Sequence, residues 1–417
     1  MQRVLVAIRW WQVGWSLVVG LLGIQGIAPV VGQEENTAQR YQISQRAAEI
    51  HRRAYVFDGH NDLPWELRTK APRLFEDIGI SKPQPKLHTD IARLRAGNVG
   101  AQYWSVYVPV ETIAAGNAFQ TTKEQIEIVH KMIARYPDVF ELALNGEDVV
   151  RIQGQGKIAS LIGMEGGHSI EGSIGKLRQL HAMGARYMTL THSETLDWAD
   201  SATDEAKSDG LSPFGEEVVR EMNRLGMLVD ISHVSPATMH DVLRVSSVPV
   251  IFSHSSARAL ADHPRNVPDD VLAALPKNGG VVLINFFSGF VVPESAAALL
   301  EQSKLRKELK TKYPGNKEAQ EREIKQWQLT HPYPAGTAEI LIDHIEHVIR
   351  IAGIDHVGLG SDFDGISKLP VGVEDVSKYP VITELLLRRG YDEEAIRKIL
   401  FGNALRVLEK GTNASGK

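Results

Sequence analysis

The 417-residue sequence contains no cysteine. Disulfides and thiolate metal sites are therefore excluded. If the protein binds a metal, the ligands must come from its 15 histidines and its 51 aspartate and glutamate residues. These nitrogen and oxygen donors suit a divalent cation such as zinc.

Other absences narrow the range of functions. The net charge is −5 and no block of basic residues occurs, which argues against nucleic acid as a partner. No Gly-x-Gly-x-x-Gly follows an early predicted strand, so a dinucleotide site is unsupported. A Gly-x-Ser-x-Gly nucleophile elbow is also missing. The pairs Ser232-His233 and Ser253-His254 do not replace it, because neighbours on a strand point to opposite faces and are predicted not to form a Ser–His dyad.

Residues 1–32 form a segment of their own. Two arginines precede an apolar run from about Trp10 to Val31, which ends in small and then polar residues. This order is typical of an export signal. An uncleaved membrane anchor is the alternative, because the run is long enough to span a bilayer. Residues 33–45 are predicted to be a linker.

The C-terminal end carries no hydrophobic tail of the kind that directs a GPI anchor, and residues 411–417 are predicted to be a disordered tail. An exported chain without cysteine is more typical of a bacterial envelope or a secreted bacterial protein than of a eukaryotic cell surface. We therefore expect export to the bacterial periplasm or the medium. Membrane attachment is expected only if the N-terminal segment is retained.

Between residues 46 and 410, short apolar runs alternate with longer helical patterns, which predicts βα units and a parallel sheet. Eight strands, each followed by a helix in one continuous domain, predict a single (β/α)8 barrel of the TIM type; an open doubly wound sheet is the alternative. The predicted strands are Tyr55–Asp58, Ala101–Val108, Ile158–Met164, Tyr187–Thr191, Met227–Ile231, Val248–Phe252, Gly280–Phe286 and Val357–Ser361.

The predicted helices span 89–97, 122–135, 173–183, 213–225, 235–245, 268–276, 337–352, 380–389 and, as an extra C-terminal helix, 392–409. Ser212 and Ser235 each precede a proline, the pattern of an N-cap followed by proline at the first helical position. Residues 292–336, after the seventh strand, form a highly charged helical insertion. We expect a surface decoration there; a lid or an oligomer contact is the alternative.

Ionisable side chains follow the apolar runs of most predicted strands. They are His60 with Asp62, Glu165, His192, His233, His254 and Asp362. In a barrel these strand ends meet on the face where active sites lie. Histidines and carboxylates gathered there suit a pair of divalent cations that share a hydroxide, which is a strong nucleophile near neutral pH.

The order of the strands suggests a role for each side chain. Glu165 is predicted to bridge the two metals, because its strand lies between the strands that supply the other ligands. Asp362, on the strand that closes the barrel, is predicted to carry a proton from the nucleophile to the leaving group. His192 would stabilise a developing oxyanion or serve as a third ligand to one metal.

Several motifs resemble those of the membrane (renal-type) dipeptidases, zinc dipeptidases of the amidohydrolase-like barrel group. They are Gly59-His-Asn-Asp-Leu-Pro-Trp65, Leu161-Ile-Gly-Met-Glu-Gly-Gly-His-Ser169, Leu190-Thr-His-Ser193, His233-Val-Ser235, Phe252-Ser-His-Ser-Ser256, Arg265-Asn-Val-Pro-Asp-Asp270 and Asp362-Phe-Asp-Gly365. The resemblance extends from about residue 45 to 409. It implies two zinc ions per chain, bridged by Glu165. One is also bound by His60 and Asp62 and the other by His233 and His254.

The resemblance also implies how a dipeptide is bound and cut. His192 would contact the substrate and the tetrahedral intermediate, and Asp362 would act as the acid/base group. Arg265 would hold the terminal carboxylate, a role that suits a guanidinium fork. Phe290 stands where a tyrosine near the substrate is expected. The family implies tolerance of a D-residue at the second position, hydrolysis of β-lactams in some members, and homodimers.

Two other functions remain open at this stage. The same barrel and metals would serve an esterase, a lactamase or another amidohydrolase. A non-catalytic envelope protein that binds a metal or a peptide is the third hypothesis.

Overall fold

The computed structural model describes residues 37–70 and 78–413. The predicted export signal or anchor at residues 1–32 lies outside them, as do residues 414–417 of the predicted tail. Among the helices of the described ranges, none has the length and apolar character needed to cross a membrane.

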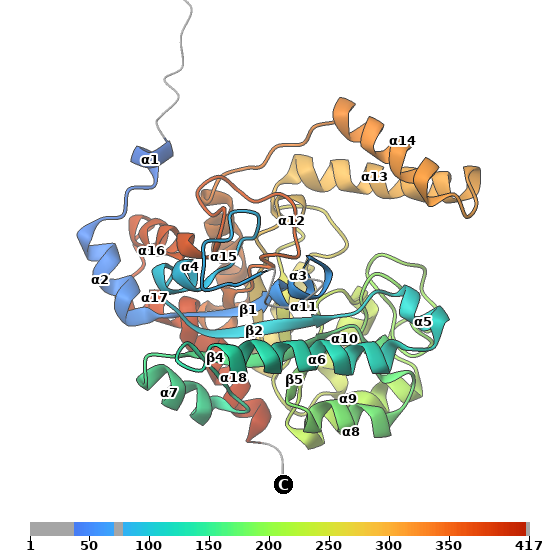
Figure 1. Ribbon diagram of the computed structural model, residues 1–417, viewed down its shortest axis with the longest axis horizontal. Coiled ribbons are helices and arrows are strands. Elements are labelled where there is room, and N and C mark those ends of the chain that lie inside the picture. Colours follow the sequence, from blue (N-terminus) through green and yellow to red (C-terminus); the bar gives the residue numbers. More distant parts are fainter. Residues whose placement is uncertain (1–36, 71–77, 414–417) are drawn as a thin grey trace, which may run out of the picture. The chain divides into compact units, whose positions relative to one another are not determined.

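A single parallel sheet forms the centre of the described chain (Figure 1). Its strands are β1 Val56–Asn61, β2 Val99–Tyr107, β3 Phe140–Leu142, β4 Ile158–Glu165, β5 Ala185–Thr189, β6 Leu228–Asp230, β7 Ile251–Ser255, β8 Val281–Ile284 and β9 Val357–Leu359. The spatial order is β2-β1-β9-β8-β7-β6-β5-β4-β3, and pairing of β2 with β4 closes the ring. The predicted (β/α)8 barrel is confirmed.

The sequence did not predict β3, which lies outside the closed ring of eight strands. It pairs with the start of β4, whose other edge pairs with β2 and whose end pairs with β5. A strand of three residues shows no periodicity, so the pattern of the sequence could not reveal it. The helix α7, Gly146–Gly154, follows with Asn145 as its N-cap and was also missed.

Helices surround the strands, and most were predicted. They are α2 Gln45–Ala54, α3 Leu63–Lys70, α4 Ile91–Ala96, α6 Ala118–Arg135, α8 Ile174–Ala182, α9 Pro213–Leu225, α10 Pro236–Val245, α11 Asp269–Asn278, α15 Glu339–Ala352 and α16 Tyr379–Arg388. Ser212 and Ser235 cap α9 and α10 as predicted, since each hydroxyl accepts a hydrogen bond from a backbone N–H of the first turn. No helix was predicted at α2 or at α3, and α3 directly follows His60 and Asp62.

The barrel is packed with large side chains below the strand ends. Phe57 stacks on Tyr103 with ring centroids 5.6 Å apart, and Tyr103 contacts Tyr187 at 4.7 Å. Phe401, from the C-terminal helical region, covers Phe57 at 5.6 Å. That region comprises α17 Glu393–Arg397, a π-helical turn at Lys398–Gly402 and α18 Asn403–Thr412, where one continuous helix was predicted. Buried aromatic area therefore makes the barrel a rigid support for the strand ends.

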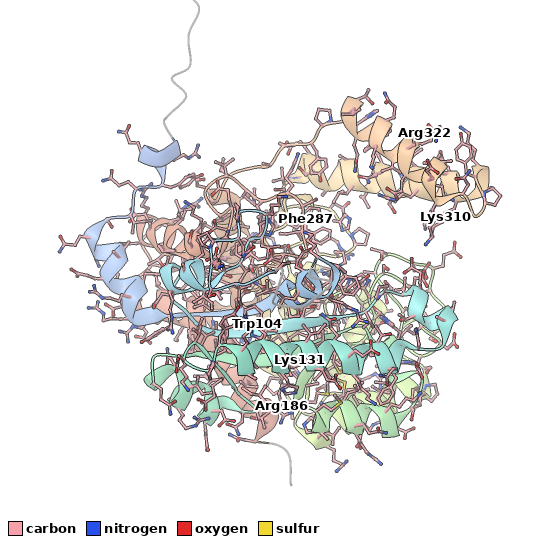
Figure 2. The ribbon with its side chains drawn as sticks, in the orientation of Figure 1. Trp104, Lys131, Arg186, Phe287, Lys310 and Arg322 are labelled. Carbon is pink, nitrogen blue, oxygen red and sulfur yellow. The ribbon has the colours of Figure 1, made fainter. Side chains whose placement is uncertain are left out.

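The charged insertion is a helical hairpin. After the short α12, Ser288–Val291, come α13, Pro293–Lys312, and α14, Lys317–Thr330, as predicted from the charged pattern. Figure 2 shows Lys310 and Arg322 on the hairpin, and both side chains are exposed. Lys317 reaches Glu111 of α5, Glu111–Ala115, in an ion pair of 3.5 Å.

Candidate metal centre

The first pair of predicted ligands lies at the end of β1. The side chains of His60 and Asp62 converge, with His60 Nε2 3.3 Å from Asp62 Oδ2, and both residues are buried. The Asn61 side chain between them accepts a hydrogen bond from the Leu63 N–H and so begins α3 directly after the pair. Residues i and i+2 of an extended segment point to the same side of the chain, as these two side chains do.

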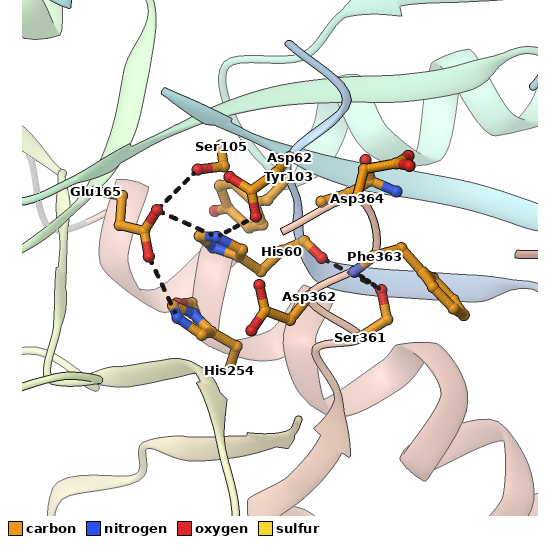
Figure 3. Close-up of polar contacts among 12 residues, drawn as sticks. His60, Asp62, Tyr103, Ser105, Glu165, His254, Ser361, Asp362, Phe363 and Asp364 are labelled. Carbon is orange, nitrogen blue, oxygen red and sulfur yellow. Dashed lines mark hydrogen bonds and ion pairs between the residues drawn. The ribbon is translucent and has the colours of Figure 1, made fainter. Parts of the chain in front are cut away.

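Glu165, the last residue of β4, lies between two groups of side chains (Figure 3). Its Oε2 atom is 3.6 Å from His60 Nε2, on the side of Asp62. Its Oε1 atom faces the other group, at 3.2 Å from His233 Nε2 and 3.4 Å from His254 Nε2. Burial alone would raise the pKa of Glu165, but the charge of His60 beside it holds that pKa well below its usual range. The carboxylate therefore stays ionised, with one oxygen aimed at each group.

The second group contains His233, which follows β6, and His254 of β7. Their Nε2 atoms are 2.9 Å apart. Burial lowers the pKa of both imidazoles well below the usual value, so both are neutral and each has a nitrogen lone pair to offer. Two nitrogen lone pairs beside a carboxylate oxygen form a ligand set for a borderline cation.

Ser253 and His254 were predicted not to form a Ser–His dyad because strand neighbours point to opposite faces, but their side chains are in contact. The Oγ of Ser253 lies 2.7 Å from Nδ1 of His254. The regular alternation fails here because the pairing of β7 with β8 shifts register between Phe252 and Ser255. The hydroxyl donates to the buried carboxylate of Asp230 at 2.6 Å, so it supports the histidine and is not an activated nucleophile.

The residues present fit a pair of bound cations. Within the described ranges, three groups of potential ligands have atoms within 4.8 Å of one another: His60-Glu165-His254, Glu165-His192-His233 and His60-Asp62-Asp362. The buried His60 Nε2 has no hydrogen-bond partner, as expected of a nitrogen that binds a metal in place of a proton. On the other side of that ring, Nδ1 lies 2.8 Å from the Tyr187 hydroxyl, and such a contact fixes the ring of a metal-binding histidine.

Asp362 follows β9 and lies beside His60 and His254 (Figure 3). Its Oδ2 accepts a hydrogen bond of 2.8 Å from the Asn285 side-chain amide, and its backbone N–H donates to the His60 carbonyl at 3.0 Å. Burial, together with the nearby charges of Asp62 and Glu165, raises the pKa of Asp362 well above its usual value. Asp362 is therefore the carboxyl of this centre that is suited to hold a proton.

His192 lies in the loop after β5, three residues beyond the last residue of that strand and one beyond the end that the sequence predicted. Its Nε2 atom is 3.7 Å from Glu165 Oε1, and its side chain is 21% exposed. Its ring lies 4.5 Å from that of His233 and 5.0 Å from that of Tyr107, which the sequence analysis did not identify. His192 is thus more accessible than the five predicted metal ligands, on the open side of the centre.

Arg265 lies against the second ligand group. It is 3% exposed, and its Nη2 donates to the His254 carbonyl at 3.1 Å. Its guanidinium lies over the ring of Phe290, 5.3 Å from the centroid, and Phe290 also contacts His263 at 4.8 Å. Burial lowers the Arg265 pKa to about 10, so the group is still charged at neutral pH. No carboxylate of the described residues forms an ion pair with it.

One open cavity of about 810 Å³ is lined by every predicted site residue except the buried His60, namely Asp62, Glu165, His192, His233, His254, Arg265, Phe290 and Asp362. Its wall also carries Trp65, Lys86, His88, Phe287 and Ile366. A cavity of this volume accommodates a small substrate with several polar groups.

A parallel (β/α)8 barrel with histidines and carboxylates gathered at its strand ends defines the class of metal-dependent hydrolases. Comparison with known families makes the assignment more specific: the chain belongs to the membrane dipeptidase family, peptidase family M19, whose sequence model matches residues 44–417. Members of this family are metallopeptidases, and the resemblance noted in the sequence is confirmed.

Solved structures support the same assignment. The probable dipeptidase PvdM from Pseudomonas aeruginosa is 25% identical with a TM-score of 0.77, over 89% of this chain and 98% of that one. Dipeptidase AC, a metallopeptidase of family M19, is 25% identical with a TM-score of 0.70, over 86% and 98%. A metallopeptidase from Rhodobacter sphaeroides, bound to a phosphinate mimic of L-Ala-D-Ala, is 24% identical with a TM-score of 0.70, over 86% and 99%. The last comparison supports the fold.

Proposed function

We propose that the protein is a binuclear zinc dipeptidase. The observation that carries the proposal is that the Glu165 carboxylate lies between two ligand groups, next to a buried, charged Arg265 that forms no ion pair with any carboxylate of the described ranges. The first feature suits two cations and the second suits an anionic substrate group. A dipeptide has its scissile carbonyl and its terminal carboxylate only a few bonds apart, as this arrangement requires.

In this proposal Glu165 is shared by the two zinc ions. His60 and Asp62 complete the ligands of one ion, and His233 and His254 those of the other. Bound zinc would supply Lewis acidity and make a water molecule nucleophilic near neutral pH. The supporting geometry is the separate orientation of the two Glu165 oxygens.

Arg265 would bind the terminal carboxylate of the substrate and so select peptides of two residues. A guanidinium pairs bidentately with a carboxylate, and burial strengthens that pairing. The ring of Phe290 stacks against one face of the guanidinium. Phenylalanine in place of the expected tyrosine therefore keeps this stacking contact and lacks only the hydroxyl. A longer peptide would have an uncharged amide where Arg265 needs an anion, and it would be rejected.

Two further residues would assist the reaction. His192 lies on the open side of the centre and would donate a hydrogen bond to the oxyanion that develops at the carbonyl, an effect of 10²–10³ in rate in other enzymes. Asp362 would accept a proton from the attacking water and deliver it to the leaving amine, because its raised pKa suits both steps.

The proposal extends to substrates and to cellular setting. The family resemblance supports a D-residue at the second position and hydrolysis of β-lactams. It also supports a homodimer. The composition of residues 1–32 supports export to the bacterial periplasm or the medium, with attachment to a membrane if that segment is retained.

A substrate panel with metal-analysed protein tests the proposal. We expect hydrolysis of L,L- and L,D-dipeptides and of a β-lactam, but not of tripeptides or dipeptide amides. A chelator should abolish activity and added zinc should restore it. Equal rates on dipeptides and their amides would contradict the role of Arg265. Turnover of lactones or phosphotriesters in place of dipeptides would indicate another amidohydrolase, and binding without turnover would indicate a peptide-binding protein.

A further inference from the structure

Two aspartates buried in the barrel wall contact the metal-ligand groups, and the proposed function gives them no role. Asp58 is on β1 and Asp230 is on β6; both are 0% exposed. Neither forms an ion pair with a lysine or arginine within the described ranges. A buried carboxylate without a cation is costly unless several hydrogen bonds satisfy it, so its partners indicate what it does.

Asp230 binds the segment that carries His254. Its Oδ1 accepts hydrogen bonds from the backbone N–H of Ser232 at 3.0 Å and of Ser253 at 2.9 Å. Its Oδ2 accepts from the Ser253 hydroxyl at 2.6 Å and from the hydroxyl of Thr189. Both strands next to β6 are therefore tied to this carboxylate.

Asp58 repeats the arrangement on the other side of the centre. Its Oδ1 accepts from the backbone N–H of Ser361 at 2.8 Å and of His60 at 3.3 Å. Its Oδ2 accepts from the Ser361 hydroxyl at 2.7 Å and from the Gln102 side chain at 3.0 Å. As with Asp230, the carboxylate accepts from the backbone N–H of the residue two positions later. It also accepts from both the N–H and the hydroxyl of a serine, here Ser361 directly beyond the adjacent strand β9.

Each of these serines directly precedes a residue of the centre. Ser253 precedes His254 and Ser361 precedes Asp362. Pairing of β7 with β8 shifts register between Phe252 and Ser255, and pairing of β1 with β2 shifts register between Asp58 and Asn61. Such irregularities release backbone N–H groups from the regular ladder and redirect side chains. The two carboxylates bind N–H groups within or beside these irregular segments.

On the Asp230 side the contact extends to a metal ligand itself. The Ser253 hydroxyl donates to Asp230, so it can only accept from Nδ1–H of His254 at 2.7 Å. This chain of hydrogen bonds keeps the proton of His254 on Nδ1 and leaves the Nε2 lone pair directed toward Glu165. Asp230 therefore determines both the position and the tautomer of this ligand.

We infer that Asp58 and Asp230 are paired positioning residues, each of which fixes one half of the metal centre through a serine in, or directly beyond, the adjacent strand. Asp230 and Ser253 fix the half that contains His233 and His254. Asp58 and Ser361 fix the half that contains His60 and Asp362. The inference rests on the proposed metal centre and adds to it the prediction that the two halves can be weakened separately.

The test measures binding of Zn²⁺ and of Co²⁺ to full-length protein by competition with a chelator, together with the Co²⁺ absorption spectrum. In Ser253→Ala we expect the affinity for one of the two ions to fall on the order of 10- to 100-fold, while the other ion binds as in the wild type. The Co²⁺ spectrum should change for the weakened ion only. Ser253→Thr, which keeps the hydroxyl, should restore most of the affinity.

Ser160→Ala is the matched control. Ser160 is a fully buried serine of β4, and its hydroxyl accepts a hydrogen bond from the Trp104 indole. This variant should lose stability without loss of affinity for either ion. Equal affinities for both ions in Ser253→Ala and wild type would overturn the inference, as would an equal loss of affinity in Ser253→Ala and Ser160→Ala. Wild-type protein that binds no divalent metal would overturn the proposed function as well.

Discussion

His233 and Asp362 have left-handed backbone conformations, with φ of 68° and 65°. Such values are uncommon for residues other than glycine, and they cluster at functional sites where the surrounding structure enforces them. Each residue follows a strand of three residues and turns its side chain back toward the centre. The function of the centre therefore depends on local backbone strain that the rigid barrel maintains.

The role of Asp362 is tested by Asp362→Asn. The amide has nearly the shape of the carboxyl group but cannot carry a proton between the attacking water and the leaving amine. We expect kcat to fall by orders of magnitude, while zinc content stays near two per chain by elemental analysis. Asp355→Asn, a partly exposed control outside the cavity, should leave both quantities unchanged. Normal turnover in Asp362→Asn would refute the assignment.

Arg265→Lys tests recognition of the substrate carboxylate. Lysine keeps the charge but lacks the planar fork and its stacking on Phe290. We expect kcat/KM for dipeptides to fall about 100-fold, in line with the 2–3 kcal/mol of a buried charged hydrogen bond, and mainly through KM. The measurement is the ratio of kcat/KM for a dipeptide to that for its amide, which should collapse toward one. A ratio equal to that of the wild type would exclude Arg265 as the carboxylate site.

The candidate ligands could be predicted from the sequence, but the residues that support them could not. His60, Glu165 and His254 were found because each ends or follows an apolar run. The contacts of Tyr187 with His60 and of Asp230 with Ser253 could not be predicted, since they depend on cross-strand register. Register shifts at the bulges occur where no sequence pattern marks them.

At the scale of elements, the barrel strands were predicted and their ends were not. The strand predicted as Val248–Phe252 is displaced to Ile251–Ser255, so that His254 lies inside β7. The strand predicted as Tyr187–Thr191 ends at Thr189, which leaves His192 in a loop. The apolar run in the sequence continues past the end of a strand where buried residues surround the candidate site. The end of the run therefore does not show where the hydrogen-bonded pairing of strands stops.

We predict that the hairpin of α13 and α14 is a surface decoration with no part in catalysis. Lys317 of the hairpin forms an ion pair with Glu111 of α5, but the two side chains are 81% and 69% exposed, so the pair contributes little to stability. The ends of the insertion are close, since the Ser295 hydroxyl donates to the Pro334 carbonyl at 2.6 Å. A short linker could therefore replace residues 296–330.

The deletion of residues 296–330 should leave kcat/KM within about twofold of the wild type, because the insertion supplies no predicted ligand or substrate contact. Enzyme kinetics, thermal unfolding and sedimentation measure activity, stability and subunit number on the same sample. Lys317→Ala serves as the matched control for the ion pair alone. Reduced kcat/KM with an unchanged Tm would support a lid, and a changed subunit number would support an oligomer contact.

At the scale of the whole molecule, buried histidines away from the metal centre connect elements distant in sequence. His51 of α2 lies 2.7 Å from the Thr383 hydroxyl of α16. His344 of α15 accepts from the backbone N–H of Ala257 and contacts the Val291 carbonyl, each at 3.0 Å. Burial lowers the pKa of both His51 and His344 to about 4. Both are therefore neutral in the folded protein, where they form structural contacts between elements.

These pKa values make the stability of the fold depend on pH. A histidine with a folded pKa near 4 and an unfolded pKa near 6.5 stabilises the protein fully above pH 6.5. Between those values the unfolded state binds one more proton. Stability therefore falls by about 1.4 kcal/mol per pH unit, per histidine, as the pH falls through this window.

His344→Gln tests this dependence in metal-free protein, where the ligand histidines cannot release a metal on acidification. Urea unfolding between pH 5 and 6.5 should give a free energy of unfolding whose slope with pH is shallower by about 1.4 kcal/mol per unit than in the wild type. Ile345→Val, at the next buried position of α15, should cost about 1 kcal/mol without changing the slope. Equal slopes for His344→Gln and wild type would show that His344 takes up its proton before the fold is lost, because only a histidine that stays neutral in the folded state adds to the slope.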